Sequence, residues 1–328
     1  MHPNQQALTS PELTIRLQVR CSLTLLRSGM SDRTHLCLEA LEESCLPDEE
    51  RIRRIRAERW ISYTRAEEVL VRMIELLEYP PRDRMPCLLL YGSTGMGKTK
   101  ILRKFLRDHP SEPGRRKSRP RHPIISMQMP PEPDERSLYE EILSSLQVPV
   151  RSVSTSHLRP IVRDMLRYVD VRMLVVDEVH TMIASTYRKQ RVLLNTLRFL
   201  ATDLRIPLVC AGTHDAKRAL TTDPQIADRF EAIELPHWQN NESLHRLLTS
   251  FQSLLPLRVR SDLVAPAMRR ALLERTEGVT VRLVRLIETL AVDAIRNQTE
   301  KIDSTSLHRL STPPLLSMTE SHPASDAS

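Results

Sequence analysis

Apolar and polar positions follow two alternating patterns through the middle of the chain. Short apolar runs, which are typical of buried strands, occupy 86–91, 124–129, 171–177, 206–210 and 231–235. Between them apolar residues recur at helical spacing, at about 98–108, 135–146, 156–169 and 188–203, with a short helix within 215–231. Strands that alternate with helices favour a parallel sheet with helices on both faces. We therefore expect an α/β domain with a five-stranded parallel sheet over 86–236.

After this region the chain changes to helical periodicity alone. The pattern beyond Trp238 predicts helices at about 241–255, 263–276, 280–297 and 303–310, with Gly278 separating the second from the third. We expect these helices to form a small lid domain over 237–310. Residues 311–328 carry no periodic apolar positions, so a disordered tail is expected there.

The chain before the sheet is also expected to be helical, with residues 49–85 leading into the core. A charged helical pattern runs from His35 to Trp60, and its arginines are expected on a solvated face. The next helix should begin with a capping box in which Thr64 and Glu67 satisfy each other's N–H groups. Residues 1–48 form an extension that we expect to be partly disordered. Residues 1–30 contain a strand-like alternation, and alternatively the first 29 residues precede a natural start at Met30.

The first strand runs into a phosphate-loop motif, whose residues are Gly92, Ser93, Thr94, Gly95, Met96, Gly97, Lys98 and Thr99. Its glycines let the backbone curl so that N–H groups point at phosphate oxygens, and the following helix adds its positive end. The lysine of such a loop reaches the β- and γ-phosphates, and the threonine hydroxyl ligates Mg²⁺. The motif therefore predicts ATP and Mg²⁺ binding, with Lys100 beside it in the nucleotide-binding set.

Two further strand ends carry the side chains that ATP hydrolysis needs. The third apolar strand ends in Asp177-Glu178, where Asp177 would hold Mg²⁺ and Glu178 would orient and deprotonate the attacking water. The fourth strand leads to Thr213, which would lie near the γ-phosphate unless this is a simple turn into a helix. The three positions together predict an ATPase.

Two arginines are candidates for contacts with the transferring phosphoryl group. Arg229 follows a short helix and can project from the domain edge toward the ATP of a neighbouring subunit, as arginine fingers do. A surface ion pair with Asp228 or Glu231 is the alternative. Arg282 lies one turn into the helix after Gly278, where a lid arginine can reach back to phosphate, and Arg285 is the competing position.

Composition limits the class of protein. Among 328 residues, 27% are charged and 40% are hydrophobic, and no apolar run approaches the roughly 20 residues of a membrane span, so we expect a cytoplasmic protein without a membrane partner. The five cysteines form no C-x-x-C pair, which fits a reducing compartment and argues against structural zinc.

The net charge of +7 is compatible with a polyanionic partner, although basic proteins without a nucleic-acid partner are also common. The candidate contacts are the basic residues of a Pro-rich loop, Arg115, Arg116, Lys117, Arg119 and Arg121, with Arg151 and Lys189 as further candidates. They would bind backbone phosphates without reading sequence. A solvated loop without a ligand is the alternative.

The assembled motifs resemble those of the AAA+ ATPases, and two longer stretches resemble the TniB family of transposition ATP-binding proteins. One runs from Arg51 to Thr99 and includes Arg59-Trp60-Ile61-Ser62-Tyr63-Thr64-Arg65-Ala66. The other runs from Asp177-Glu178-Val179-His180 through Leu194-Asn195-Thr196-Leu197-Arg198 to Pro207 and Ala211-Gly212-Thr213. The resemblance covers about residues 35–310.

This resemblance implies an accessory ATPase of transposition. Family members bind ATP, assemble into rings or filaments on double-stranded DNA and recruit a transposase, in some cases with a target-selection adaptor protein, and hydrolysis controls the assembly. The resemblance also implies that Trp60 to Thr64, including Tyr63, lies beside the adenine. From the sequence alone, Trp60 and Tyr63 are equally compatible with a role in the core.

Two other functions stay open. A helicase loader or replication initiator would carry overlapping motifs, although no helix-turn-helix reader is evident after the lid. A nucleotide-gated scaffold without significant turnover would also bind ATP, although Glu178 argues against it. A preference for a helicase over a transposase would favour the first, and unchanged phosphate release in Glu178→Gln would favour the second.

Overall fold

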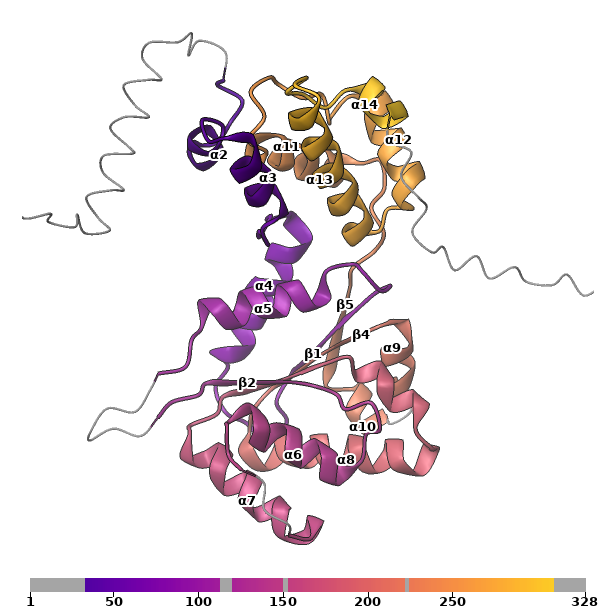
Figure 1. The fold of residues 1–328 in the computed structure, drawn as a ribbon. Coiled ribbons are helices and arrows are strands. Elements are labelled where there is room, and N and C mark those ends of the chain that lie inside the picture. The colour runs from indigo at the N-terminus through magenta and orange to yellow at the C-terminus, as the bar shows by residue number, and fades with distance from the viewer. Residues whose placement is uncertain (1–32, 113–119, 150–152, 222–223, 310–328) are drawn as a thin grey trace, which may run out of the picture. The chain divides into compact units, whose positions relative to one another are not determined.

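The computed structural model describes residues 33–112, 120–149, 153–221 and 224–309 (Figure 1). The segments 1–30 and 311–328 discussed above lie outside these residues. The described chain forms two compact units. The sheet unit comprises Glu58–Phe251 and Arg270–Leu286, and the helical unit comprises the described residues within Met1–Ala57, Gln252–Arg269 and Ile287–Ser328. The domain boundaries expected from the sequence stay a prediction.

The sheet unit is built on five parallel strands in the order β2-β3-β4-β1-β5. Their bounds are β1 Cys87–Tyr91, β2 Ile124–Gln128, β3 Met173–Asp177, β4 Leu208–Gly212 and β5 Phe230–Glu234. Tyr91 pairs with Gly212 on one side and with Glu234 on the other, so the carboxyl ends of these strands share one edge. The predicted parallel five-stranded sheet is confirmed. The fourth strand begins two residues later than expected, because Ile206 still donates its N–H to the preceding helix at Ala201.

Helices cover both faces of this sheet, as the alternation predicts. The helices of the sheet unit between the first and last strands are α5 Lys98–Asp108, α6 Glu135–Ser145, α7 Thr155–Tyr168, the 3-10 helix η2 Val179–Ala184, α8 Tyr187–Leu204, α9 His214–Thr221 and α10 Pro224–Ala227. Leu88 and Leu90 of β1 pack with α5 and with α4 (Thr64–Leu77), whereas Leu89 packs with α6 to α9 on the other face.

The remaining helices flank the sheet in sequence. They are α2 Leu38–Glu43, α3 Asp48–Arg56, α11 Glu242–Leu254, α12 Pro266–Thr276, α13 Thr280–Arg296 and α14 Ser304–Arg309. No described helix combines the length and the apolar composition that crossing a membrane requires.

The predicted capping box at the start of α4 is wrong. The helix begins at Thr64 itself, so Tyr63 is the N-cap and no side chain caps the helix. Glu67 then lies one position too far along the helix for the reciprocal contact. Its carboxylate instead accepts a hydrogen bond of 2.6 Å from the Ser62 hydroxyl.

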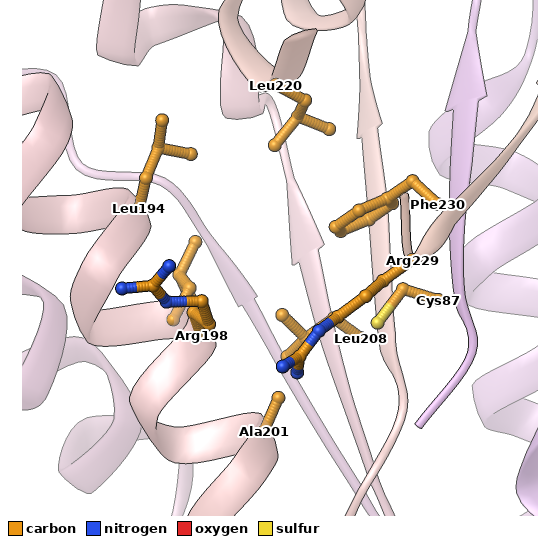
Figure 2. A pocket seen from close by; sticks show the side chains of 9 residues that line it. Cys87, Leu194, Arg198, Ala201, Leu208, Leu220, Arg229 and Phe230 are labelled. Atoms are coloured by element: carbon orange, nitrogen blue, oxygen red, sulfur yellow. The ribbon is translucent and has the colours of Figure 1, made fainter. Parts of the chain in front are cut away.

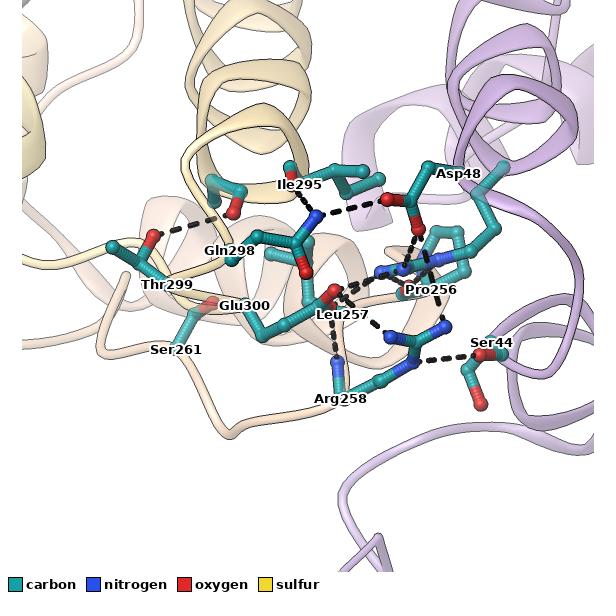
Figure 3. A network of polar contacts seen from close by, with 12 residues as sticks. Ser44, Asp48, Pro256, Leu257, Arg258, Ser261, Ile295, Gln298, Thr299 and Glu300 are labelled. Atoms are coloured by element: carbon teal, nitrogen blue, oxygen red, sulfur yellow. Dashed lines mark hydrogen bonds and ion pairs between the residues drawn. The ribbon is translucent and has the colours of Figure 1, made fainter.

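The helical unit contains a buried ionic network around Glu300 (Figure 3), and the place of Arg51 in it contradicts the expected solvated face. The Arg51 side chain is fully buried and donates to both carboxylate oxygens of Glu300, at 2.8 and 2.5 Å. It also donates to the Pro256 carbonyl and to Asp48. The Arg258 N–H donates to Glu300 at 3.1 Å. These contacts join α3 to the segments around residues 256 and 300, whereas Arg53 on the same helix is exposed, as expected.

Candidate nucleotide-binding site

The phosphate loop connects the end of β1 to the start of α5. Gly97 is the N-cap of α5 with a φ of 95°, a left-handed conformation that favours glycine, and a Cβ there would meet no atom within 4 Å. A Cβ on Gly92 would instead lie 2.5 Å from the Leu235 carbonyl oxygen, so only glycine fits the close approach to the chain after β5. The loop therefore curls at the carboxyl edge of the sheet, as the motif predicts.

Lys98 is nearly buried and holds the loop in this curled form. Its ammonium donates hydrogen bonds of 2.8 and 2.9 Å to the carbonyl oxygens of Gly92 and Ser93. Burial lowers the pKa of Lys98, and the charges of Glu178 and Asp177 oppose this shift. Two carbonyl oxygens thus hold the ammonium beside the loop, within range of the acidic strand end.

Thr99 and Asp177 meet at this edge although they are far apart in sequence. The Thr99 hydroxyl donates to Asp177 Oδ2 at 2.7 Å. The described residues contain no cluster of three or more His, Cys, Asp and Glu side chains that could hold a metal alone. A hydroxyl and a carboxylate are nevertheless the oxygen donors that Mg²⁺ takes from proteins when phosphates and water complete its shell. The donor set therefore fits Mg²⁺ held together with a nucleotide.

Glu178 directly follows this strand in an unusual backbone conformation. Its φ of 57° and ψ of 34° lie in the left-handed region, which is rare for a residue with a long side chain. The Glu178 N–H donates to Asp177 Oδ1 at 2.8 Å, and its carbonyl accepts from the Thr181 N–H at 3.1 Å. These two contacts fix the turn that presents the carboxylate.

His180 contacts this carboxylate, and sequence reasoning assigned it no role. Its Nε2 lies 3.3 Å from Glu178 Oε2, while its Nδ1 is buried and has no hydrogen-bond partner among the described residues. The available signal was its place in Asp177-Glu178-Val179-His180, two residues after the acid.

Thr213 lies at the end of β4, the strand between β1 and β3 in the sheet. Its hydroxyl is buried, and within the described part of the chain it makes no hydrogen bond. Buried polar atoms are nearly always paired, so an unpaired hydroxyl at this edge fits a site for a polar ligand. The structure thus brings Thr213 to the same edge as the phosphate loop and Asp177.

The other predicted nucleotide contacts occupy varied environments. Met96 is buried in the core beneath the loop, and Thr94 is exposed. Lys100 is half-exposed, with its Nζ 3.9 Å from a Glu58 carboxylate oxygen. Tyr63 packs edge-on against Trp238, with ring centroids 5.1 Å apart, and burial raises the pKa of Tyr63 to about 12.

The start of α13 contacts the phosphate loop directly. The Val281 N–H donates to the Gly95 carbonyl at 2.9 Å, and the Trp238 indole N–H donates to the Thr280 hydroxyl at 3.0 Å. Arg282 lies in this first turn, but its guanidinium pairs with Glu277 at 2.8 Å. The backbone therefore places Arg282 near the loop, and the side chain has an acidic partner of its own.

Arg229 lies at the opposite edge of the sheet. It precedes β5, and its carbonyl accepts from the N–H of Cys87, the first residue of β1. Its side chain runs along an apolar pocket toward α8, where Nη1 donates to the Thr202 hydroxyl at 3.1 Å (Figure 2). The pocket is lined by Cys87, Leu194, Leu197, Arg198, Ala201, Leu208, Leu220, Arg229 and Phe230. The structure does not bring Arg229 to the phosphate loop of its own chain.

Most of the predicted DNA contacts fall outside the described residues, namely Arg115, Arg116, Lys117 and Arg119, together with Arg151. Arg121 is described. It is exposed and lies 3.2 Å from an Asp170 carboxylate oxygen, so an acidic neighbour already partners it. Lys189 lies exposed in the first turn of α8.

Comparisons with known proteins show which family and which fold this chain resembles. The model of the family described as "Bacterial TniB protein" matches residues 51–240. A search of the curated proteins finds no match.

Solved structures share the fold at low identity. The ORC1 protein of Aeropyrum pernix, solved in complex with DNA, is similar with a TM-score of 0.55 and 18% identity, covering 78% of this chain and 67% of that chain. The ORC2 protein of Aeropyrum pernix, solved in ADPNP–ADP complexes, is similar with a TM-score of 0.53 and 15% identity, covering 78% of this chain and 70% of that chain. A Walker-type ATPase of Pyrococcus abyssi is similar with a TM-score of 0.50 and 16% identity, covering 75% of this chain and 70% of that chain. These likenesses and the strand order identify the AAA+ P-loop fold, as expected.

Proposed function

Since the chain belongs to the TniB family of bacterial proteins, we propose that it is an ATPase that assembles on double-stranded target DNA and recruits a transposase, with hydrolysis controlling the assembly. The observation that carries this proposal is the convergence of Lys98, Thr99 and Asp177 with the unpaired Thr213 hydroxyl at one sheet edge. A curled loop with a buried lysine suits the binding of a triphosphate. Glu178, the acid that follows Asp177, suits hydrolysis.

The side chains at this edge divide the chemistry between them. Lys98 exchanges its two loop carbonyls for phosphate oxygens, and Thr213 donates its hydroxyl to the terminal phosphate. Thr99 and Asp177 hold Mg²⁺, which when bound neutralises charge on the phosphates. Glu178 accepts a proton from the attacking water at its carboxylate, and His180 orients that carboxylate through the 3.3 Å contact.

Assembly of subunits is supported by the place of Arg229. Because it lies at the edge opposite the phosphate loop of its own chain, its guanidinium is suited to a nucleotide held by a neighbouring copy. A contact of this kind is head-to-tail and propagates into a ring or a filament. The arginine must leave Thr202 and the apolar pocket to make it.

Duplex DNA as the surface of assembly is supported by the net charge of +7 and by the fold shared with ORC1, which was solved in complex with DNA. Contacts to the phosphate backbone would be strong, sensitive to salt and largely independent of sequence. The transposase, and in some systems a target-selection adaptor protein, would then dock on the assembled protein.

Mixing two inactive variants tests the shared site. Glu178→Gln and Arg229→Ala should each lower phosphate release on duplex DNA by about 10²-fold or more. An equal mixture should recover a substantial part of the activity, because an intact Glu178 from one copy then meets an intact Arg229 from the next. The matched control is Arg198→Ala, which alters the same pocket and should retain hydrolysis. A mixture no more active than its components would contradict the proposal.

A further inference from the structure

A cluster of cations covers the first turns of α8. Arg188, Lys189 and Arg191 are all exposed, and among the described residues none of them has an acidic partner. Tyr187 stands beside them with 63% of its surface exposed, and its ring centroid lies 5.8 Å from the Arg191 guanidinium carbon. We call Tyr187–Arg191 the α8 basic turn.

This arrangement opposes the usual charge pattern of a helix. The first turn carries the positive end of the helix dipole, where acidic side chains are stabilising and cations are not. Helix α3 follows the rule, with Asp48, Glu49 and Glu50 in its first turn. The first turn of α8 contains no acidic residue, which is also true of α5, α7 and α13, but at α8 three exposed cations gather there. A bound polyanion would relieve the repulsion between these cations and the helix dipole.

The α8 basic turn is connected to the proposed catalytic acid by a short, well-packed segment. Strand β3 ends at the carboxyl edge of the sheet, η2 follows Glu178 directly, and α8 begins three residues after η2 ends. Val179 and Met182 of η2 are fully buried in the core of the sheet unit. The basic turn is therefore connected to Glu178 through η2, which Val179 and Met182 anchor in the core.

From these features we propose that the α8 basic turn binds the backbone phosphates of duplex DNA and that this contact links DNA binding to hydrolysis at Glu178. Arg188 and Arg191 lie one turn apart on the helix with Lys189 next in sequence, which suits contacts to neighbouring phosphates, and an exposed tyrosine suits packing against the sugars. This inference rests on the proposed function, because it assigns the DNA contact of that assembly to a described element.

The test compares two triple variants that lose the same charge. The first is Arg188→Ala/Lys189→Ala/Arg191→Ala in the basic turn, and the control is Arg53→Ala/Arg54→Ala/Arg56→Ala on the exposed face of α3, where Glu50 already partners Arg53 and Arg54. Affinity for a duplex is measured across salt concentrations with a non-hydrolysable ATP analogue, and thermal unfolding checks that each variant is folded.

We expect the basic-turn variant to lose about tenfold or more in duplex affinity, with a salt slope shallower by about 2 to 3, since each phosphate contact contributes about 0.9. Stimulation of phosphate release by DNA should fall with it, and the control should match the wild type. A basic-turn variant that binds DNA like the wild type overturns this inference alone, even if it loses a protein partner. A wild-type protein without affinity for duplex DNA overturns the proposed function instead.

Discussion

Both units of this protein bury polar side chains, and the fully paired Arg51 of the helical unit contrasts with two unpaired atoms beside the proposed nucleotide site. In the helical unit, Arg51 is fully buried and donates to Glu300, Asp48 and the Pro256 carbonyl, so its donors are matched by acceptors. At the carboxyl edge of the sheet unit, the Thr213 hydroxyl and His180 Nδ1 are buried without a partner in the described chain.

The helical unit also buries atoms without a hydrogen-bond partner in the described chain, on Gln252, Arg269 and Asp293, so an unpaired atom alone does not mark a ligand site. Thr213 and His180 differ because they lie beside the phosphate loop and Glu178, where a bound nucleotide would supply a partner.

The difference has a physical basis. A buried polar group without a partner costs about 1–3 kcal/mol, whereas a paired one is close to neutral or mildly stabilising. At the sheet edge beside the phosphate loop, a bound nucleotide would supply the missing partner of the Thr213 hydroxyl. Breaking the network in the helical unit should therefore affect folding, and altering the sheet edge should affect activity.

The largest expected effect is on stability, from Arg51→Ala. Removing the guanidinium leaves the buried Glu300 carboxylate without its main partner, which should lower the free energy of unfolding by about 3–5 kcal/mol. Arg53→Ala on the same helix is the control, since that side chain is exposed and its ion pair contributes at most about 1 kcal/mol. Urea denaturation of both variants measures the contrast, and equal losses would show that the network is not structural.

Thr213→Val should produce the opposite pattern. It removes the unpaired hydroxyl at nearly constant volume, so stability should stay constant or rise. Phosphate release should fall by about 10- to 100-fold, the size expected for one lost hydrogen bond to a charged group. Thr213→Ser, which retains the hydroxyl, should keep most of the activity. A stability loss in Thr213→Val with unchanged turnover would mean that this hydroxyl belongs to the core.

His180→Ala should give a smaller effect, on turnover rather than on binding. The histidine reaches Glu178 through a single partly exposed contact, so we expect kcat to fall by about tenfold with little change in KM. His180→Gln can donate a hydrogen bond to the same carboxylate and should recover part of the loss. Steady-state kinetics separates the two parameters, and a rise in KM alone would contradict a positioning role.

The smallest effect should come from Asp303, which caps α14. Its carboxylate accepts from Thr305 and from the backbone and hydroxyl of Ser306, and the Thr305 hydrogen bond is the largest cause that lowers the Asp303 pKa to about 2. Asp303→Ala should cost about 1 kcal/mol at neutral pH. Because the folded-state pKa lies below the unfolded value, this stability is present above about pH 4 and is lost as pH falls toward 2. Urea denaturation across this range should show the two proteins converging, and a constant difference would contradict the assignment.

The sequence predicted the elements that depend on local pattern. The phosphate loop, the five strands and their helices follow from motif and periodicity, and the meeting of Thr99 with Asp177 follows from parallel strands that share one edge. The roles of these residues stay predictions until activity is measured.

The features that the sequence did not predict depend on distant partners or on backbone detail. Arg51 is buried because Glu300 lies against it from 249 residues away, and no local pattern reveals that pairing. The contact between His180 and Glu178 requires the left-handed turn at Glu178. The predicted capping box at Thr64 is wrong because the helix begins one residue earlier than predicted, and helix starts are the least certain part of a pattern.

Electron microscopy of the protein with duplex DNA tests the central claim most directly. The wild type and Lys98→Ala are each imaged with and without a non-hydrolysable ATP analogue, and Arg103→Ala, a change at an exposed position of the same helix, serves as the control. The account predicts nucleotide-dependent rings or filaments on DNA for the wild type and the control, and none for Lys98→Ala. Polymers of Lys98→Ala equal to those of the wild type would contradict it.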